Sequence, residues 1–342
     1  MADKLVIGGR EIAPETKQVV RLRVTQDLDG GEVAIWVHVI HGKQPGPTLG
    51  LFGLQHGDEW ITIEMMRQTI DQLDPMIISG TVLIVPVCNP VALGSVQRNT
   101  QPESDGPDLN RVWPGVHTWL AESMAKLIDR EVVQHCDALF DFHLGPWGSA
   151  FSEVFYGIDY PDQDVVRRCR ELGIAFGHLS LGRGKVVEVF PGPRSLMGYA
   201  GAVLGIPALG VEIGGAGFSV EEERSWVTDT VRGIKNSMRH LGMLDEPLEK
   251  PERILTFTRT VRVNPTVGGL LVPEREPDQL LREVKQNELL GRIISPYTFE
   301  ELERLKAPCD GWLVYKARSY PVRPGHWAFG VAVADGAEWI TP

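Results

Sequence analysis

The sequence predicts an α/β protein in which helices flank a sheet, with a smaller all-β domain at the carboxyl end. Two patterns support this fold class. Apolar runs of strand length alternate with helical periodicity through residue 245, whereas short β-type runs separated by turns dominate from residue 254 onward. The length of 342 residues also fits two domains, since a domain averages about 150 residues.

The first predicted domain, residues 1–245, contains the strands of the main sheet. Two β-rich runs lie between residues 19 and 40, separated by a turn signal at 27–31. Four apolar runs follow, which begin at Leu49, Thr81, Asp137 and Pro207. Their nearly continuous hydrophobicity is typical of strands that are buried on both faces. Residues 59–73 and 119–133 each place apolar side chains on one stripe, which predicts two helices.

The second predicted domain, residues 254–342, follows a segment at 244–253 that has the proline and charge of a linker. Helical periodicity is sparse here, so we expect a small all-β domain. Its predicted strands lie at 257–263, 268–272, 290–294, 311–315 and 328–334.

Composition narrows the classes of partner. The chain has 34 Lys and Arg against 45 Asp and Glu, a formal net charge of −11, which argues against nucleic acid because that partner requires a basic face. No apolar run reaches the roughly 18 residues of a membrane span. The first residues lack the apolar core of a signal peptide, so we expect a cytoplasmic protein. The sequence leaves open whether the chain forms homo-oligomers.

Candidate metal ligands follow two of the apolar runs, at the strand ends where sheets of this kind hold their sites. His56 and Glu59 are three residues apart at the start of a predicted helix, so one helical turn can direct both side chains at a single cation. His143 ends the third run. Two histidines and one carboxylate with a vacant fourth position form the pattern of a catalytic zinc site.

Polar residues follow the other apolar runs as well. Glu212 lies within the fourth run, where a carboxylate is costly unless it has a partner or a task. We expect it to take a proton from water. Arg98 and the segment 108–111 follow the second run. Arginines in such loops are either solvated, or bind a carboxylate or stabilise an oxyanion.

Five short motifs occur in a fixed order. They are HGDE from His56, NPVALGSVQR from Asn89, DLNR from Asp108, DFH from Asp141 and VEIGG from Val211. Together they resemble the succinylglutamate desuccinylase/aspartoacylase family, which is related to the zinc carboxypeptidases. The resemblance implies a zinc-carboxypeptidase-like mixed sheet and a C-terminal barrel-like β domain.

The resemblance also implies roles for individual residues. One Zn²⁺ per chain would bind His56, Glu59 and His143, with Glu212 as general base and then proton shuttle. Arg98 would polarise the scissile carbonyl, and the substrate carboxylate would be held by Asn110 and Arg111. Asp108 and Asp141 would support this site. Arg194 is either a second substrate arginine or a solvated one.

The implied reaction is hydrolysis of the amide bond of a small anionic N-acyl amino acid. The chain resembles the aspartoacylases proper less than it resembles a bacterial subgroup of similar length, which includes deacetylases of acetylated diaminobutyrate. Aspartoacylases have a polar stretch where residues 144–148 read Leu-Gly-Pro-Trp-Gly, so the acyl group stays open. A metallocarboxypeptidase that acts on peptide C-termini would share these residues. A non-catalytic zinc-dependent binding protein is a further alternative, although structural zinc has four protein ligands and only three are identified.

The C-terminal domain resembles biotinyl and lipoyl carrier domains. A carrier needs a lysine at an exposed hairpin tip, and the corresponding residues 294–299 contain none. We therefore expect this domain to form a wall or lid beside the active site. His326 and Trp327 are its most unusual residues, and packing in the core or at an interface explains them best.

Overall fold

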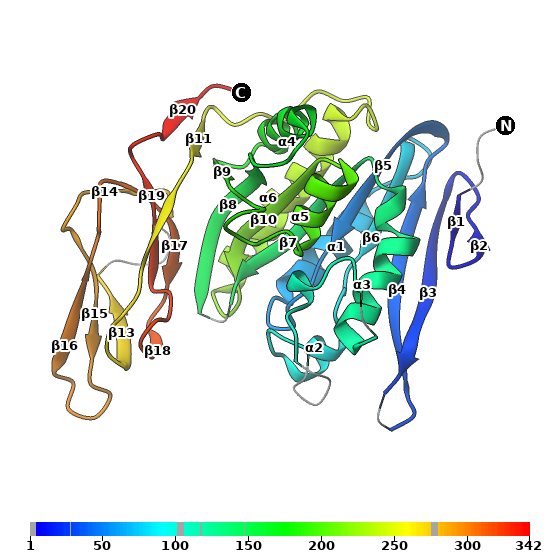
Figure 1. Ribbon diagram of the computed structural model, residues 1–342. Helices are drawn as coiled ribbons and strands as arrows, with labels where there is room; N and C mark the ends of the chain where they lie inside the picture. The colour runs from blue at the N-terminus through cyan, green and yellow to red at the C-terminus, as the bar shows by residue number, and fades with distance from the viewer. Residues whose placement is uncertain (1–4, 28, 101–105, 117, 147, 275–279) are drawn as a thin grey trace.

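A computed structural model describes residues 5–27, 29–100, 106–116, 118–146, 148–274 and 280–342, and Figure 1 shows its arrangement. A large mixed sheet of 14 strands runs through the described residues. Its centre consists of four parallel strands in the order β10 (Ala208–Gly215), β7 (Ala138–Gly145), β5 (Gln44–Phe52) and β6 (Ser79–Val85). These strands correspond to the four predicted apolar runs, so the expected mixed α/β fold is confirmed.

Antiparallel strands extend both sides of this parallel centre. Beyond β6 lie β4 (Glu32–His41) and β3 (Thr16–Gln26), which form the β-rich hairpin near the start of the chain. Beyond β10 the sheet continues through β8 (Ser149–Gly157), β17 (Gly311–Ala317), β19 (Phe329–Val333) and β12 (Thr260–Val263). The other members are β9 (Ser180–Gly184), β11 (Ile254–Phe257), β14 (Glu283–Val284) and β20 (Glu338–Ile340).

Helices cover both faces of the sheet. On one face α6 (Val220–His240) packs against both α1 (Ile61–Gln72) and α4 (Gln163–Phe176). The other face carries α3 (Leu120–Glu131) and the short α5 (Leu196–Tyr199). The other helical segments within the described residues are α2 (Pro90–Ser95), the single 3-10 turns η2 (Leu109–Arg111) and η3 (Val133–His135), and the π-helical segment η4 (Ala200–Leu204).

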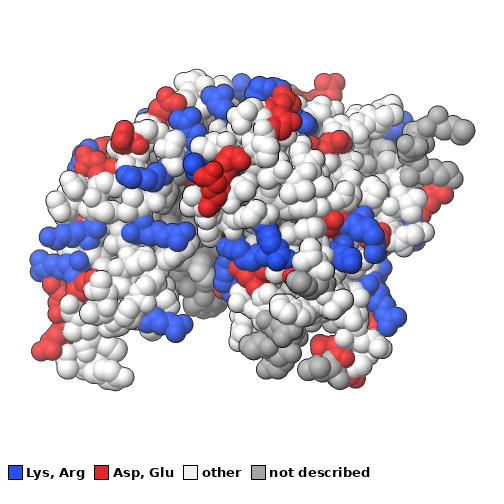
Figure 2. Space-filling model, in the orientation of Figure 1, with Lys and Arg blue, Asp and Glu red and all other residues white. Residues whose placement is uncertain are grey.

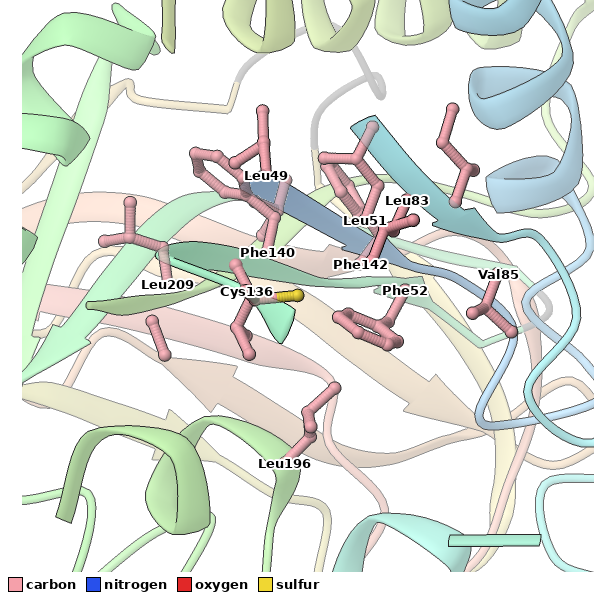
Figure 3. Close-up of a cluster of buried hydrophobic side chains, with 14 of the residues drawn as sticks. Leu49, Leu51, Phe52, Leu83, Val85, Cys136, Phe140, Phe142, Leu196 and Leu209 are labelled. Atoms are coloured by element: carbon pink, nitrogen blue, oxygen red, sulfur yellow. The ribbon is translucent and has the colours of Figure 1, made fainter. Parts of the chain in front are cut away.

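The central strands hold the main hydrophobic core. Figure 3 shows side chains projecting from both faces of the strands, with α1 above them and the helix of Leu196 below. Leu49, Leu51, Phe140 and Phe142 have no measurable exposure. Burial on both faces explains why these runs are almost continuously apolar.

The C-terminal residues form a second, four-stranded sheet with a separate small core. Its strands are β16 (Glu301–Lys306), β15 (Leu289–Ile294), β13 (Gly269–Pro273) and β18 (Tyr320–Val322). The large sheet nevertheless crosses the predicted linker, because β8 pairs with β17 and β9 pairs with β11. Backbone hydrogen bonds therefore attach the C-terminal strands to the side of β8.

Several elements were not evident in the sequence. They include β8, β9, α4 and α6, the two-residue strands β1 (Val6–Ile7) and β2 (Arg10–Glu11), and the C-terminal strands β14, β16, β18 and β20. In β8 buried residues alternate with partly exposed ones. The strand therefore lacks the continuous apolar run by which its parallel neighbours were predicted. The α6 helix begins with a capping box, in which Ser219 and Glu222 bond to each other's backbone N–H.

Helix hydrophobicity and surface charge are the last two features of the fold. Within the described residues, no helix is both long enough and apolar enough to cross a membrane. On the face shown in Figure 2, Lys and Arg side chains are intermixed with Asp and Glu.

Candidate active site

The carboxyl ends of the parallel strands bring the candidate residues together. His56 follows β5, His143 lies in β7 and Glu212 lies in β10. In the parallel pairing of β7 with β10, Glu212 is the direct neighbour of His143. The sheet topology therefore joins residues that are far apart in the chain at one edge.

The three predicted metal ligands form a tight buried group. One oxygen of the Glu59 carboxylate lies 2.8 Å from His56 Nδ1, and the other lies 2.9 Å from His143 Nδ1. One donor atom from each residue falls within 4.8 Å of the others. Donors on a single zinc ion lie about 3 to 4 Å apart, given zinc–nitrogen bonds near 2.1 Å. The donor types and their spacing fit a zinc ion.

Carboxylates orient both imidazole rings from behind. His56 Nε2 lies 3.0 Å from Asp108 Oδ1, and His143 Nε2 lies 3.1 Å from Asp141 Oδ1. A ring whose Nε2–H donates to a carboxylate keeps its Nδ1 lone pair for a metal, which is the usual support of a histidine ligand. The supporting roles expected for Asp108 and Asp141 agree with this geometry.

Asp141 is the centre of a buried hydrogen-bond network. Its Oδ1 accepts a bond of 2.5 Å from Gln55 Nε2, and its Oδ2 accepts a bond of 3.0 Å from Asn110 Nδ2. Trp113 Nε1 in turn donates to Gln55 Oε1 at 2.8 Å. Gln55 and Asn110 thus hold the carboxylate that orients His143, and Trp113 holds Gln55.

Opposite charges shift the titration of the ligand residues. Burial alone would lower the pKa of His143, but the Asp141 and Glu59 carboxylates outweigh it and raise that pKa well above its ordinary value. The pKa of His56 is also raised, because Glu59 and Asp108 outweigh burial. Burial would raise the pKa of Glu59, yet the two imidazoles lower it to about 2. Glu59 is therefore ionised at neutral pH, as a metal ligand requires.

Glu212 has the properties of a poised base. Its Oε2 is buried and has no hydrogen-bond partner among the described residues. Burial, opposed by His143 and reinforced by Glu59, raises the pKa of Glu212 to about 7. A general base is most effective when its pKa lies near the working pH.

Backbone geometry holds His56 in place. Leu54 adopts a left-handed conformation with φ of 48°, which is strained for a residue with a branched side chain. A Cβ atom on Gly57 would lie only 2.0 Å from the carbonyl oxygen of Ala92. The backbone at Gly57 thus approaches α2 closely, which packs the His56 loop against that helix.

The motif from Asn89 to Arg98 brings the Arg98 guanidinium close to the predicted metal ligand Glu59. Asn89 caps α2 through Ala92 N and donates to the carbonyl oxygen of Gln55. The chain then returns Arg98 to the site, with NH1 3.7 Å from Glu59 Oε1 and NH2 3.3 Å from Asp108 Oδ2. The Arg98 side chain is 45% exposed, so its remaining donors face open space.

Asn110 and Arg111 differ in their surroundings. Asn110 is buried; its Nδ2 lies 2.9 Å from His143 Nε2 and its Oδ1 accepts from the Leu196 N–H. Arg111 is partly exposed, and its guanidinium lies 5.1 Å from the ring centre of Phe190. Asn110 is therefore placed to hold His143 in position. The partly exposed Arg111 guanidinium is the group of the two that can donate to a substrate.

A stack of cations and rings connects this region to the C-terminal strands. The Phe190 ring contacts the guanidinium groups of both Arg111 and Arg262, and the Arg262 group lies 5.4 Å from the Phe190 ring centre and 3.4 Å from the Trp327 ring centre. Trp327 also packs edge-on against Phe151 of β8. His326 stacks on the ring of Tyr320. Trp327 therefore packs where the C-terminal strands meet β8, whereas His326 packs against Tyr320 within the C-terminal strands.

Arg194 reaches the same loop region. Its NH2 bonds to Glu122 Oε1 at 2.9 Å and to the carbonyl oxygen of Val112 at 3.0 Å. Its side chain is 45% exposed. Trp147, in the stretch that departs from aspartoacylases, lies outside the described residues.

Comparison with known proteins identifies the family. The sequence profile of the succinylglutamate desuccinylase/aspartoacylase catalytic domain matches residues 45–241, which is more than half of the chain. The chain belongs to this family. It is 30% identical, over 236 residues, to the N-alpha-acetyl-L-2,4-diaminobutyric acid deacetylase of Halomonas elongata. That match covers 68% of this chain and 66% of the relative, slightly less than two thirds of the relative's length.

Solved structures share the whole fold. A succinylglutamate desuccinylase/aspartoacylase of Rhodobacter sphaeroides superimposes with a TM-score of 0.78 at 22% identity and covers 96% of each chain. A product-bound ectoine utilization protein of Ruegeria pomeroyi gives a TM-score of 0.80 at 22% identity, with 94% of this chain and 98% of that chain covered. The C-terminal strands are thus included in the shared architecture.

Several residues near the site were not predicted from the sequence, among them Gln55, Trp113, Glu153, Phe190 and Arg262. For Glu153 a signal was present, since it is a carboxylate within an apolar run, the same feature that selected Glu212. Phe190 and Arg262 lie in a loop and at a sheet edge, and their sequence surroundings carry no such signal.

Proposed function

We propose that this protein is a zinc-dependent amidohydrolase that removes the acyl group from a small anionic N-acyl amino acid. The observation that carries the proposal is the buried His56–Glu59–His143 group with the unpartnered Glu212 oxygen beside it. Family membership and the Halomonas relative, which deacetylates N-acetyl-diaminobutyrate, support the same reaction class.

His56, Glu59 and His143 would hold the ion. When bound, Zn²⁺ supplies a Lewis acid that polarises a carbonyl and acidifies water. Glu212 accepts the proton of the attacking water and then delivers it to the leaving nitrogen as the C–N bond breaks. A pKa near 7 suits both steps.

Arginines on one side of the site would bind the substrate carboxylate and the carbonyl oxygen that becomes anionic. Arg98, beside Glu59, donates to the oxygen that becomes anionic as the carbonyl is attacked. Arg111 binds the substrate carboxylate through its free donors, and Asn110 keeps this loop against the ligand shell. Arg194 offers the substrate the donors that are not bonded to Glu122 and Val112.

The C-terminal strands favour a small substrate over a peptide. The contacts of Phe190 with Arg262 and of Trp327 with Phe151 support the proposal that these strands form a wall beside the site. A wall at this position limits the length of the amine component. The metallocarboxypeptidase alternative requires room for a peptide chain there.

A substrate screen tests the proposal. The purified protein, loaded with zinc, is incubated with N-acetyl, N-succinyl and N-formyl amino acids and with short peptides. We expect release of a free amino acid from at least one N-acyl amino acid. Rapid release of C-terminal residues from peptides without deacylation would refute the deacylase assignment and favour a carboxypeptidase. Zinc binding without any turnover would favour a binding protein.

A further inference from the structure

Glu153 is a carboxylate at the site that the proposed reaction does not use. It lies in β8 and is the direct neighbour of Glu212 in the antiparallel pairing of β8 with β10. Glu212 is in turn the neighbour of His143 on the other side. Directly paired residues project to the same face of a sheet. His143, Glu212 and Glu153 therefore stand in one row across three adjacent strands, about 5 Å apart.

The surroundings of Glu153 leave its carboxyl group without a partner. Within the described part of the chain, no hydrogen bond or ion pair joins this carboxyl group to another residue. The nearby charges are Glu212 and Arg262, and the Arg262 guanidinium lies against the rings of Trp327 and Phe190. Burial and the Glu212 charge, opposed by Arg262, raise the pKa of Glu153 to about 8. A carboxyl group held this way gains most from a cation that comes to it.

The local fold makes room for this side chain. Gly182 of β9 lies under it, and a Cβ atom at that position would come within 2.1 Å of Glu153 Oε1. Gly184, two residues further along the same strand, has no atom within 4 Å of the equivalent position. The glycine at 182 is therefore required for the present position of the Glu153 carboxyl, whereas the glycine at 184 is not.

The order of the row shows which part of a substrate Glu153 faces. The carbonyl carbon must lie near the metal ligands, and the leaving nitrogen must lie near Glu212, which protonates it. A line from His143 through Glu212 continues to Glu153. The group beyond the leaving nitrogen is the amine component, so Glu153 faces its side chain.

We propose that Glu153 is a specificity residue that binds a cationic group, such as a second amine, on the amine component of the substrate. The inference rests on the proposed function and adds the charge of the amino-acid side chain. The Arg111 side would bind the α-carboxylate, and Glu153 would bind the ammonium. An anionic side chain would find no ion pair beside Glu153 and Glu212, and it would be repelled wherever either carboxyl group is ionised.

Binding of free amino acids tests the inference without turnover. Calorimetry compares 2,4-diaminobutyrate with 2-aminobutyrate on the zinc-loaded wild type, and we expect at least tenfold tighter binding of the diamine. In Glu153→Gln this preference should disappear. Gly182→Ala should reduce it as well, and Gly184→Ala, the matched control, should leave it unchanged. Equal binding of both amino acids by the wild type would overturn the inference.

Kinetics separates this role from an effect on Glu212. The substrates are the N-α-acetyl derivatives of 2,4-diaminobutyrate, norvaline and glutamate. We expect Glu153→Gln to lower kcat/KM tenfold or more for the first substrate and to change it less than threefold for norvaline. An equal fall for all three would show that Glu153 acts through Glu212, and would overturn the inference. If the wild type hydrolyses none of the three while its calorimetric preference persists, the proposed deacylation fails and the cation site stands.

Discussion

Replacing Asp141 by Asn tests the hydrogen-bond support of the metal ligands. Asp141 accepts three bonds with two oxygens, from Gln55, Asn110 and His143. An amide has one oxygen, so Asn at this position retains either the bonds from Gln55 and His143 or the bond from Asn110. In both cases an N–H donor meets the NH₂ group that replaces the other oxygen.

The magnitude follows from these contacts. Loss of a carboxylate behind a histidine ligand lowers metal affinity by about 10- to 100-fold, which is about 1.4 to 2.8 kcal/mol. Separately, the buried donor that loses its acceptor lowers the free energy of unfolding of the metal-free protein by roughly 1 to 3 kcal/mol. Both effects arise at a residue that is 1% exposed.

Two measurements check this prediction. Competition with a chromophoric chelator gives the zinc affinity, and denaturant unfolding gives the stability of the metal-free protein. Asp164→Asn is the control, because this carboxylate is exposed on α4 and pairs with Arg167. Unchanged zinc affinity in Asp141→Asn would refute the assignment of His143 as a ligand oriented by Asp141.

Three further predictions concern turnover. Glu212→Gln should retain zinc and lower kcat by about 10²- to 10⁴-fold, measured by amino-acid release and metal analysis; a fully active variant would remove Glu212 as the base. Because burial raises the pKa of Glu212 to about 7 and only the ionised base accepts a proton, kcat/KM should fall as the pH drops through 7; a flat profile from pH 8 to 5 would contradict this. Phe190→Ala removes a cation–π contact of about 0.5 to 1 kcal/mol from Arg111, so KM should rise about two- to fivefold with kcat preserved, and the exposed neighbour Val189→Ala should change neither; a lower kcat at constant KM would argue against a role in carboxylate binding.

The parallel centre of the fold and the ligand group could be predicted because their signals are local. Strands buried on both faces are continuously apolar, and a polar residue at the end of such a strand stands out. His56, His143 and Glu212 follow this rule, and Glu59 was found by its three-residue spacing from His56. Their convergence then requires only that parallel strands share one edge.

The residues that were not predicted depend on long-range pairing. Glu153 faces the site because β8 pairs with β10 in one particular register, and a shift of one residue would turn its side chain to the other face. Arg262 lies 50 residues beyond Glu212, and the sheet brings it back through β17, β19 and β12. Neither relation has a periodicity that can be read along the chain.

Metal removal and restoration test the central claim most directly. Zinc content and N-acyl amino acid hydrolysis are measured in one preparation, before chelation, after chelation, and after zinc is returned. We predict about one zinc per chain in the active protein, loss of hydrolysis with the metal, and recovery with zinc but not in His143→Ala. Full hydrolysis by the metal-free protein would contradict the account.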